Sequence, residues 1–548
     1  MAFYRAHVLV CGGTPCLLRG ARAIKDELVR EVHRLSLAEE IRIIETGCLG
    51  PCDDGPVILV YPEGIMYSRL RTEDIPRIVE EHLLKGRVAQ ELVYREERPD
   101  ELKKVVSLEH QDYLETQHRV VLRNCGRLDP DSIKEYIANN GYQALAKCLT
   151  ELTPEQVLTT IEDSGLRGRG GAGFPTGVKW SFTAKTAADQ KYIVCNADEG
   201  EPGTFKDRLI LEGDPHSIIE GMAIAGYAVG ADQGIVYIRG EYTLSIARMK
   251  KAIAQAKEVG LLGNGIFGTG FNFEIKIRSG AGAYVCGEET ALIESIEGNR
   301  GEPRVKPPYP GVAGLWGKPT VVNNVETLAN VAPIILNGAD WFKGIGTAKC
   351  PGTKVFTMLG DISNQGLIEV PMGITLREII NGVGGGIPGG RSFKMAQTGG
   401  TSGGCLPTEF LDLPMDYDTL AAAGSSLGSG ALLIMDDTHC IIDILQCFMR
   451  FFRHESCGKC TPCREGTTRL YELISGFAEG KAERGDLDLI KELAKTMELS
   501  SLCGLGQAAP NSVLTCLQYF EPEFEAHLRE ECAAGSCRFF AGKSPQAV

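Results

Sequence analysis

The chain has 548 residues, 43% hydrophobic and 23% charged, with a formal net charge of −14 and 19 cysteines. This length predicts several domains, because single hydrophobic cores seldom grow beyond roughly 250 to 300 residues. The acidic balance argues against a nucleic-acid partner, no apolar run is long enough to cross a bilayer, and residues 1–10 lack the pattern of a signal peptide. We therefore expect a cytoplasmic protein, in which cysteines bind metals more often than they form disulfides.

The first 90 residues predict a small domain with β-α-β-β order. Apolar runs at 6–10, 41–44, 57–61 and 65–67 predict strands, and 18–35 predicts a helix. Cysteine pairs with C-x4-C and C-x3-C spacing follow the first two strands, where loops can converge. Four thiolates on two loops can hold a [2Fe–2S] cluster, with zinc or a redox disulfide as the alternatives. The four candidate ligands are Cys11, Cys16, Cys48 and Cys52.

This pattern resembles the thioredoxin-like [2Fe–2S] ferredoxin domain. The charged residues 91–118 lack an apolar period, and we predict that they form a linker.

A glycine-rich stretch at residues 165–180 holds six glycines, two arginines and a lysine. Bare backbone with cations beside it is typical of a site for an anionic cofactor. The stretch contains G-x-G-x-x-G, but the preceding residues 153–163 have helical rather than strand periodicity. An ordinary dinucleotide-binding fold is therefore disfavoured, and a different flavin or nucleotide fold is expected. A plain surface loop is the alternative, which Phe174 and Trp180 argue against.

More polar turns follow predicted strands farther along the chain. The strand at 191–195 leads into Asn196-Ala-Asp-Glu-Gly-Glu201, which is either a solvated acidic turn or a set of acceptors for cofactor hydroxyls. Strands at 234–239 and 273–278 follow, and the second opens on another glycine-rich turn. If the sheet is parallel, these turns form one pocket together with the proline-stiffened 301–310 and the polar 322–328.

Together these motifs closely resemble the FMN- and NADH-binding subunit of respiratory complex I and its soluble relatives, from about residue 119 to about residue 530. The resemblance implies a Rossmann-like FMN domain that is not an ordinary dinucleotide fold. The FMN residues that it implies are Gly168, Arg169, Gly170, Lys179, Asn196, Asp198, Glu199, Tyr284, Asn323, Asn324 and Thr327. The NADH residues that it implies are Phe174, Phe182, Glu201, Glu289, Lys306 and Tyr309. Glu201 and Glu289 would act in catalysis by positioning the nucleotide.

Residues 346–430 have the strand, strand, helix order of a β-grasp domain, which corresponds to the ubiquitin-like insert of that family. We expect this domain to make contacts rather than chemistry. Its glycine-rich segments 384–390 and 399–404 are interpreted as tight turns, with a second phosphate site as the alternative.

The strongest metal signal is C-x2-C-x2-C in a helical region, because three thiolates at that spacing can wrap one face of a [4Fe–4S] cube. The resemblance supplies a distant fourth cysteine, and a tetrahedral zinc site is the alternative. Arg464 would place positive charge near this cluster. The four candidate ligands are Cys457, Cys460, Cys463 and Cys503.

The C-terminal tail carries three soft ligands with four residues between each and the next, which form either a zinc site or a leftover fragment. Some bifurcating hydrogenase relatives place a structural zinc here. The candidate ligands are His527, Cys532 and Cys537, with Cys440 as the fourth ligand and Cys516 as second choice.

The expected domains are the thioredoxin-like [2Fe–2S] domain (1–90), the linker (91–118), the FMN- and NADH-binding domain (119–345), the β-grasp domain (346–430), the helical bundle with the [4Fe–4S] cluster (431–524) and the tail (525–548). Fusion of a [2Fe–2S] domain to this core resembles the β subunit of soluble NAD-linked hydrogenases, including electron-bifurcating [FeFe]-hydrogenases. The expected function is an NADH dehydrogenase, or diaphorase, subunit in a hetero-oligomer. Its partners would be a hydrogenase-type or formate dehydrogenase-type catalytic subunit and a small [2Fe–2S] subunit. The alternative from another class is an electron-wiring scaffold with an inactive flavin pocket.

Overall fold

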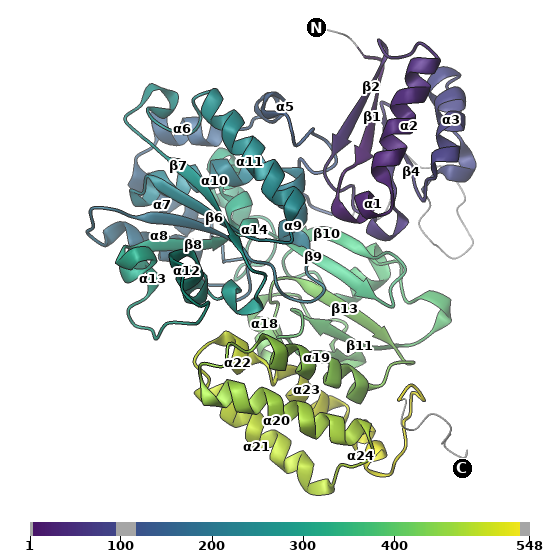
Figure 1. The fold of residues 1–548 in the computed structure, drawn as a ribbon, viewed down its shortest axis with the longest axis vertical. Coiled ribbons are helices and arrows are strands. Elements are labelled where there is room, and N and C mark those ends of the chain that lie inside the picture. Colours follow the sequence, from purple (N-terminus) through teal and green to yellow (C-terminus); the bar gives the residue numbers. More distant parts are fainter. Residues whose placement is uncertain (1–3, 95–116, 538–548) are drawn as a thin grey trace.

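The computed structural model describes residues 4–94 and 117–537 (Figure 1). Most of the predicted linker 91–118 lies outside these ranges. Four parts follow one another along the chain: an N-terminal α/β domain, a large α/β domain, a β-grasp domain and a helical domain (Figure 1). None of the helices in the described ranges is long and apolar enough to span a bilayer.

The N-terminal domain has the predicted β-α-β-β order. Its four-stranded sheet has the order β2-β1-β3-β4, in which β1 pairs parallel with β2 and antiparallel with β3. The parallel pairing places the carboxyl ends of β1 and β2 together, as two converging cysteine loops require. The elements are β1 (Ala6–Cys11), α1 (Thr14–Leu18), α2 (Ala21–Arg34), β2 (Ile41–Thr46), β3 (Ile58–Tyr61), β4 (Ile65–Tyr67) and α3 (Ile75–Arg77).

The large α/β domain is built on a parallel sheet with the order β7-β6-β5-β8. A helix and not a strand precedes the glycine-rich stretch, as the sequence predicted. The elements are α5 (Ile133–Ala138), α6 (Gln143–Glu151), α7 (Pro154–Asp163), α8 (Thr176–Lys185), β5 (Tyr192–Ala197), α9 (Lys206–Gly213), α10 (Pro215–Val229), β6 (Gln233–Arg239), α11 (Thr243–Glu258), β7 (Glu274–Gly280), α12 (Glu289–Glu297), α13 (Pro310–Ala313), β8 (Thr320–Asn324), α14 (Val325–Ala329), α15 (Val331–Asn337) and α16 (Ala339–Lys343).

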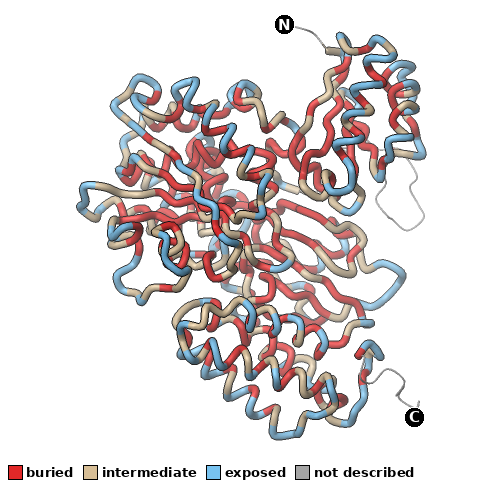
Figure 2. Tube along the Cα trace, in the orientation of Figure 1, coloured by how far each residue is buried: buried red, intermediate tan, exposed pale blue. Residues whose placement is uncertain are grey.

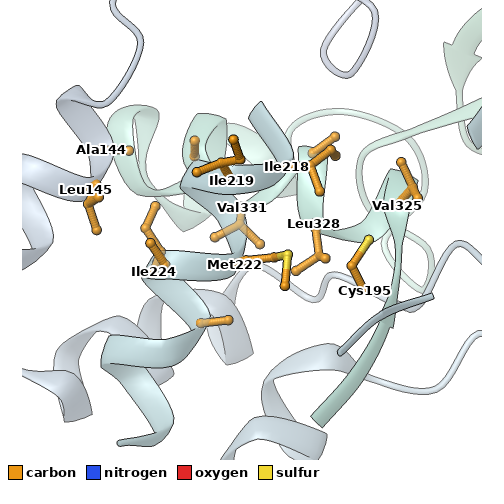
Figure 3. Close-up of a cluster of buried hydrophobic side chains, with 14 of the residues drawn as sticks. Ala144, Leu145, Cys195, Ile218, Ile219, Met222, Ile224, Val325, Leu328 and Val331 are labelled. Carbon is orange, nitrogen blue, oxygen red and sulfur yellow. The ribbon is translucent and has the colours of Figure 1, made fainter. Parts of the chain in front are cut away.

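The parallel sheet is buried on both faces. Cys195 of β5 faces the core that α10, α14 and α15 form, where Met222, Leu328 and Val331 pack together (Figure 3). Val194, its neighbour in the strand, belongs to the core on the opposite face, because successive side chains of a strand point to opposite sides. Such continuous apolar strands are typical of parallel sheets, and Figure 2 shows this buried centre with exposed helix surfaces around it.

The β-grasp domain contains a five-stranded sheet with the order β10-β9-β13-β11-β12. Strand β13 pairs parallel with β9 and antiparallel with β11, so it lies in the middle of the sheet. The predicted boundary at residue 430 therefore lies too early, and the sheet extends to Asp436. The elements are β9 (Thr353–Gly360), β10 (Gly366–Pro371), α17 (Leu376–Glu378), β11 (Phe393–Thr398), β12 (Cys405–Pro407), α18 (Tyr417–Ala422) and β13 (Ala431–Asp436).

The helical domain follows β13 directly and packs against the β-grasp domain (Figure 1). The apolar face of residues 441–449 is buried in its core. The elements are α19 (Ile441–Glu455), α20 (Thr461–Ala478), α21 (Arg484–Ser500), α22 (Gly504–Ala508), α23 (Asn511–Tyr519) and α24 (Glu521–Leu528).

Candidate functional site

The glycine-rich stretch forms a close-packed turn against the carboxyl end of β8. A Cβ atom at Gly170 would lie 2.8 Å from Cβ of Asn324, so only glycine fits this approach. The backbone N–H of Arg169 donates to Thr327 Oγ1 at 2.8 Å. The structure thus brings together the predicted flavin residues of the glycine-rich loop and those of the 322–328 turn.

The side chain of Arg169, one of the predicted flavin residues, binds other parts of the protein. Its guanidinium group is fully buried and donates to the carbonyl oxygens of Thr353, Arg167 and Pro351 at 2.7 to 3.1 Å. Arg169 therefore fastens the loop to β9 of the β-grasp domain, and only its backbone faces the other flavin residues.

The acidic turn after β5 contains a buried carboxylate that could accept hydrogen bonds from a ligand. Both carboxylate oxygens of Asp198 are buried, and neither has a hydrogen-bond partner among the described residues. Burial raises the pKa of Asp198 to about 7, although Arg239 partly counteracts it. An orphaned buried acceptor is costly, and the hydroxyl groups of a ribityl chain would satisfy it.

The neighbouring polar groups shape this turn. Asn196 donates to the carbonyl of Gly287 at 2.9 Å and accepts from the Asp198 N–H. Glu199 accepts the backbone N–H groups of Asp207 and Arg208, and burial raises its pKa to about 7.

Glu201 is also buried, and its carboxylate accepts hydrogen bonds from Tyr284 Oη at 2.7 Å, from Thr401 Oγ1 and from Ser402 Oγ at 3.2 Å. Burial raises the pKa of Glu201, and these hydrogen bonds oppose that effect. The glycine-rich segment 399–404 was interpreted from sequence as a tight turn. The positive φ angles of Gly399 and Gly400 agree with that interpretation, but no pattern in the sequence indicated that its hydroxyl groups reach Glu201. A phosphate site here is disfavoured, because the loop already binds an anion.

The predicted nucleotide side forms an ion cluster. Glu289 lies between two lysines, with its oxygens 3.1 Å from Lys179 Nζ and 3.2 Å from Lys306 Nζ. Burial would raise the pKa of Glu289, but the two ammonium groups outweigh it and lower the pKa. Lys179 also donates to the carbonyl of Val322, which links α8 to β8.

The three aromatic residues predicted for the nucleotide are large and exposed. Phe174, Phe182 and Tyr309 are 48%, 62% and 60% exposed. Tyr309 immediately precedes α13, which packs on the helix that carries Phe182. Exposed rings next to a polar cluster are suited to stack on a flat ligand.

The four cysteines of the helical domain line one common pocket. Arg464 donates to the carbonyl of Gly458 at 2.7 Å, so its charge lies beside the cysteine loop as predicted. Two separate chain segments contribute, since the fourth cysteine follows α21. A thiolate-lined cavity fits an iron–sulfur cluster, and its cysteines are Cys457, Cys460, Cys463 and Cys503.

The four N-terminal cysteines converge at the ends of β1 and β2. Cys48 Sγ and Cys52 Sγ are 3.6 Å apart, and Cys11 has hydrogen-bonding contacts with both Cys16 and Cys48. This donor set fits a [2Fe–2S] cluster.

Helix α9 connects this cysteine site to the acidic turn. At its carboxyl end, Glu212 accepts from Thr14 N at 3.1 Å and from Thr14 Oγ1 at 2.6 Å. Leu209 lines the same cavity as Cys48, and the first turn of the helix supplies the N–H groups that bind Glu199. The two sites therefore lie at opposite ends of an eight-residue helix, about 12 Å long at 1.5 Å per residue.

The tail ligands converge on the start of the helical domain. The ligand atoms of four buried residues all lie within 4.8 Å of one another. His527 Nε2 lies 3.4 Å from Cys440 Sγ and 3.3 Å from Cys537 Sγ, and a hydrogen bond from the Cys537 thiol lowers the pKa of Cys440 to about 4. Cys516 is not in the group, so the second choice of fourth ligand was wrong. The four residues are Cys440, His527, Cys532 and Cys537.

A buried set of charges beneath the flavin residues was missed from sequence. Glu326 binds Lys206 at 3.0 Å and Lys354 at 2.5 Å, and all three side chains are fully buried. Lys206 also binds Asp207 at 2.6 Å. These charged residues lie in separate motifs, and nothing in the sequence indicates that their side chains contact one another.

Family models match four segments of the chain. They are the thioredoxin-like [2Fe–2S] ferredoxin (3–83), the Nuo51 FMN-binding domain (161–333), the SLBB domain (355–406) and the NADH-ubiquinone oxidoreductase-F iron–sulfur binding region (443–527). The matches agree in order and position with the four parts of the fold.

Two relatives and a solved structure extend this similarity. The NADP-reducing hydrogenase subunit HndC of Solidesulfovibrio fructosivorans is 57% identical over 422 residues, which are 77% of this chain and 86% of that protein. An NADH-quinone oxidoreductase subunit of Rhizobium meliloti is 50% identical over 75% of this chain and 98% of its own length. The crystal structure of an NAD⁺-reducing [NiFe]-hydrogenase in the air-oxidized state matches with a TM-score of 0.66 and 30% identity, over 100% of this chain and 91% of that chain. The chain therefore belongs to the family of FMN-binding NADH dehydrogenase subunits, which bind FMN and iron–sulfur clusters and include hydrogenase subunits.

Proposed function

We propose that this protein is the diaphorase subunit of a multi-subunit oxidoreductase, and that it passes reducing equivalents between NAD(H) and iron–sulfur clusters. The observation that carries the proposal is the buried carboxylate of Asp198, which has no hydrogen-bond partner among the described residues. Asp198 directly follows β5, and β5 pairs with β8, against whose carboxyl end the glycine turn packs. A buried hydrogen-bond acceptor without a partner costs folding free energy, and a pocket that no longer binds its cofactor would not be expected to retain one. Bound FMN would supply the conversion between the hydride of NADH and the single electrons that iron–sulfur clusters accept.

Catalysis by the chain itself consists of binding and alignment. The backbone of the Gly168–Gly173 turn would bind the phosphate group of FMN, and Asp198 would accept hydrogen bonds from the hydroxyl groups of its ribityl chain. The exposed rings of Phe174, Phe182 and Tyr309 would stack on the adenine, while Glu201 and Glu289 orient the rest of the nucleotide.

Two cysteine sites offer outlets for single electrons. We propose that the four cysteines of the helical domain hold the [4Fe–4S] cluster that serves as the main outlet. The N-terminal [2Fe–2S] site, which lies one short helix from the acidic turn, would be a second outlet. The tail site would hold a structural zinc, because it is closed, buried and contributes one histidine and three cysteines.

The names of the relatives guide the choice of partners. HndC and the matched structure are hydrogenase proteins, so we propose a hydrogenase-type catalytic subunit together with a small [2Fe–2S] subunit. A formate dehydrogenase-type partner is the alternative, and electron bifurcation is a further property that only the assembled complex can test. The cysteine usage supports a cytoplasmic location.

The experiment is anaerobic purification of the chain, followed by measurement of FMN, iron and NADH-dependent viologen reduction. We expect one FMN per chain, iron and activity. Bound FMN without activity would support the scaffold alternative instead. Glu201→Gln should raise the KM for NADH and leave FMN content intact, and loss of FMN would contradict the role of Glu201.

A further inference from the structure

The carboxylate of Glu201 is held by a loop from another domain. Thr401 Oγ1 donates to one of its oxygens, and Ser402 Oγ donates to the other at 3.2 Å. Glu201 itself is 9% exposed. The two hydroxyl donors lie about 200 residues later in the sequence, so the β-grasp domain helps to determine where this carboxylate lies, together with Tyr284 of the flavin domain.

The loop is shaped for this close approach. A Cβ atom at Gly400 would lie 2.2 Å from Cγ of Glu201, and the φ of Gly400 is +77°. No other residue fits both the conformation and the space. The glycines of the segment therefore let Thr401 and Ser402 reach the carboxylate.

The far side of the loop is fastened to helix α23. Asn511 Nδ2 donates to the carbonyl of Ser402 at 2.9 Å, and Ser512 Oγ donates to the carbonyls of Thr401 and Gly403 at 3.1 and 2.8 Å. Helix α23 follows shortly after the proposed cluster ligand Cys503. The loop thus joins the nucleotide side to the helical domain.

Tyr284, the third donor to Glu201, has a similar connection. Its backbone N–H donates to Glu455 at 3.0 Å, and Glu455 lies two residues before Cys457. The ring of Tyr284 also packs edge-on against Phe451 of α19, with centroids 5.2 Å apart. Both the Thr401–Ser402 loop and Tyr284 therefore connect Glu201 to the helical domain, which carries the cluster cysteines.

We propose that Thr401 and Ser402 are positioning residues, which fix the Glu201 carboxylate so that it can bind the nucleotide, and that Ser512 holds their loop in place. The inference rests on the proposed function, because it takes Glu201 to be a nucleotide ligand. The two hydroxyl groups donate to Glu201 and to the carbonyl of Gly399, and not to the glycine turn or Asp198, so their effect should be on the nucleotide and not on the flavin.

The test compares steady-state kinetics of NADH-dependent viologen reduction by the purified chain. Thr401→Val keeps the shape and removes the hydroxyl, and we expect a roughly 10-fold rise in the KM for NADH, with kcat changed by less than about 2-fold, as for loss of a hydrogen bond to a charged group. Thr401→Ser should restore the KM. Ser402→Ala and Ser512→Ala should raise the KM by smaller factors, and FMN content should stay constant in all four variants.

The control is Thr320→Val, which removes another buried hydroxyl that bonds only to Leu315 and Lys318 among the described residues. Its KM should equal that of the wild type. In the Glu201→Gln background, Thr401→Val should change the KM by less than about 2-fold, because the two residues act through one contact.

The outcomes separate the two proposals. If Glu201→Gln leaves the KM unchanged, its proposed role as a nucleotide ligand is wrong. If Glu201→Gln raises the KM but neither Thr401→Val nor Ser402→Ala does, or if the two effects multiply fully in the double variant, the positioning role is wrong while the proposed function stands.

Discussion

The ammonium group of Lys354 lies 2.5 Å from the carboxylate of Glu326, and both side chains are fully buried. Lys354 is on β9 of the β-grasp domain, whereas Glu326 lies in the first turn of helix α14, between the predicted flavin residues Asn324 and Thr327. The same carboxylate accepts the backbone N–H of Val355 at 2.8 Å. One buried ion pair thus fixes the β-grasp domain directly beneath the flavin residues.

Replacing Lys354 by Met should destabilise the protein strongly. Removal of one partner leaves a buried carboxylate with less compensation, which typically costs about 3 to 5 kcal/mol. Chemical denaturation followed by fluorescence would measure the loss. The control is Lys343→Met, which removes an exposed ion pair with Asp340 and should cost less than about 1 kcal/mol. Similar losses in both variants would contradict the structural role of the buried pair.

Binding of FMN to the apoprotein should weaken as the pH falls below 7. In the proposed site the ionised carboxylate of Asp198 would accept the hydroxyl groups of FMN, and burial raises its pKa to about 7. Its ionised fraction therefore falls about 10-fold per pH unit below that value, and the Kd for FMN should rise in proportion. Above pH 7 the contribution of Asp198 should be constant. Fluorescence titrations between pH 5 and pH 8 in overlapping buffers would measure this.

Asp198→Asn is the matched variant for this experiment, because it keeps the shape and removes the titration. Its Kd should be higher at pH 8 and should lack the part of the pH dependence that Asp198 causes. The raised pKa also has a consequence for the apoprotein. Between about pH 4 and pH 7 the folded state holds a proton that the unfolded state has released, so Asp198 makes the apoprotein less stable as the pH rises through this range. A wild-type Kd that is independent of pH would contradict the assignment.

The tail should bind one zinc ion per chain through Cys440. Elemental analysis of Cys440→Ser should show a loss of zinc, with the [4Fe–4S] iron retained, because the two sites share no ligand. Cys516→Ser is the matched control, since Cys516 is a buried cysteine outside the group. It should keep its zinc. Zinc below about 0.3 per chain in the wild type would rule the site out.

Gly47→Ala should disturb the docking of the N-terminal domain. The added Cβ would lie 2.6 Å from Cα of Gly213 at the end of α9, and overpacking of this kind costs about 1 to 3 kcal/mol. We expect slower reduction of the N-terminal cluster by NADH, measured by rapid-freeze EPR, with unchanged FMN content. Gly270→Ala, where a Cβ meets no atom within 4 Å, is the control. An unchanged rate in Gly47→Ala would show that this docking is not needed for electron transfer.

Much of the fold could be predicted because the relevant signals are local. Strands β5, β6 and β7 are short apolar runs that end at polar turns, and such runs have few other interpretations. The helix before the glycine-rich turn was visible in its periodicity, which correctly excluded an ordinary dinucleotide fold. The clustered cysteines were equally clear, because ligand spacing within a loop is written directly in the sequence. The distant Cys503 came from the family resemblance, and Cys440 was chosen ahead of Cys516 without a local pattern.

The parts that escaped prediction depend on contacts between distant segments. The hydroxyl of Thr401 contacts Glu201 only because two domains pack together. The residues next to Thr401 and Glu201 in the sequence give no indication of this contact. Similarly, Arg169 was one of the flavin residues that the resemblance implied, but nothing in the sequence indicated that its buried side chain donates to the carbonyl groups of Thr353, Arg167 and Pro351. The order of strands in the β-grasp sheet was also hidden, because β13 pairs with β9 across more than 70 residues of chain.

The central place of β13 decides where this protein can be divided. A fragment that stops at residue 430 would lose the strand that joins β9 to β11, and would leave two separate two-stranded ribbons, each too small to be stable alone in water. Cys440 follows that strand after four residues, so a fragment that starts there would inherit the metal ligand without the sheet that anchors it. The β-grasp and helical domains should accordingly be expressed, truncated or exchanged between relatives only as one piece.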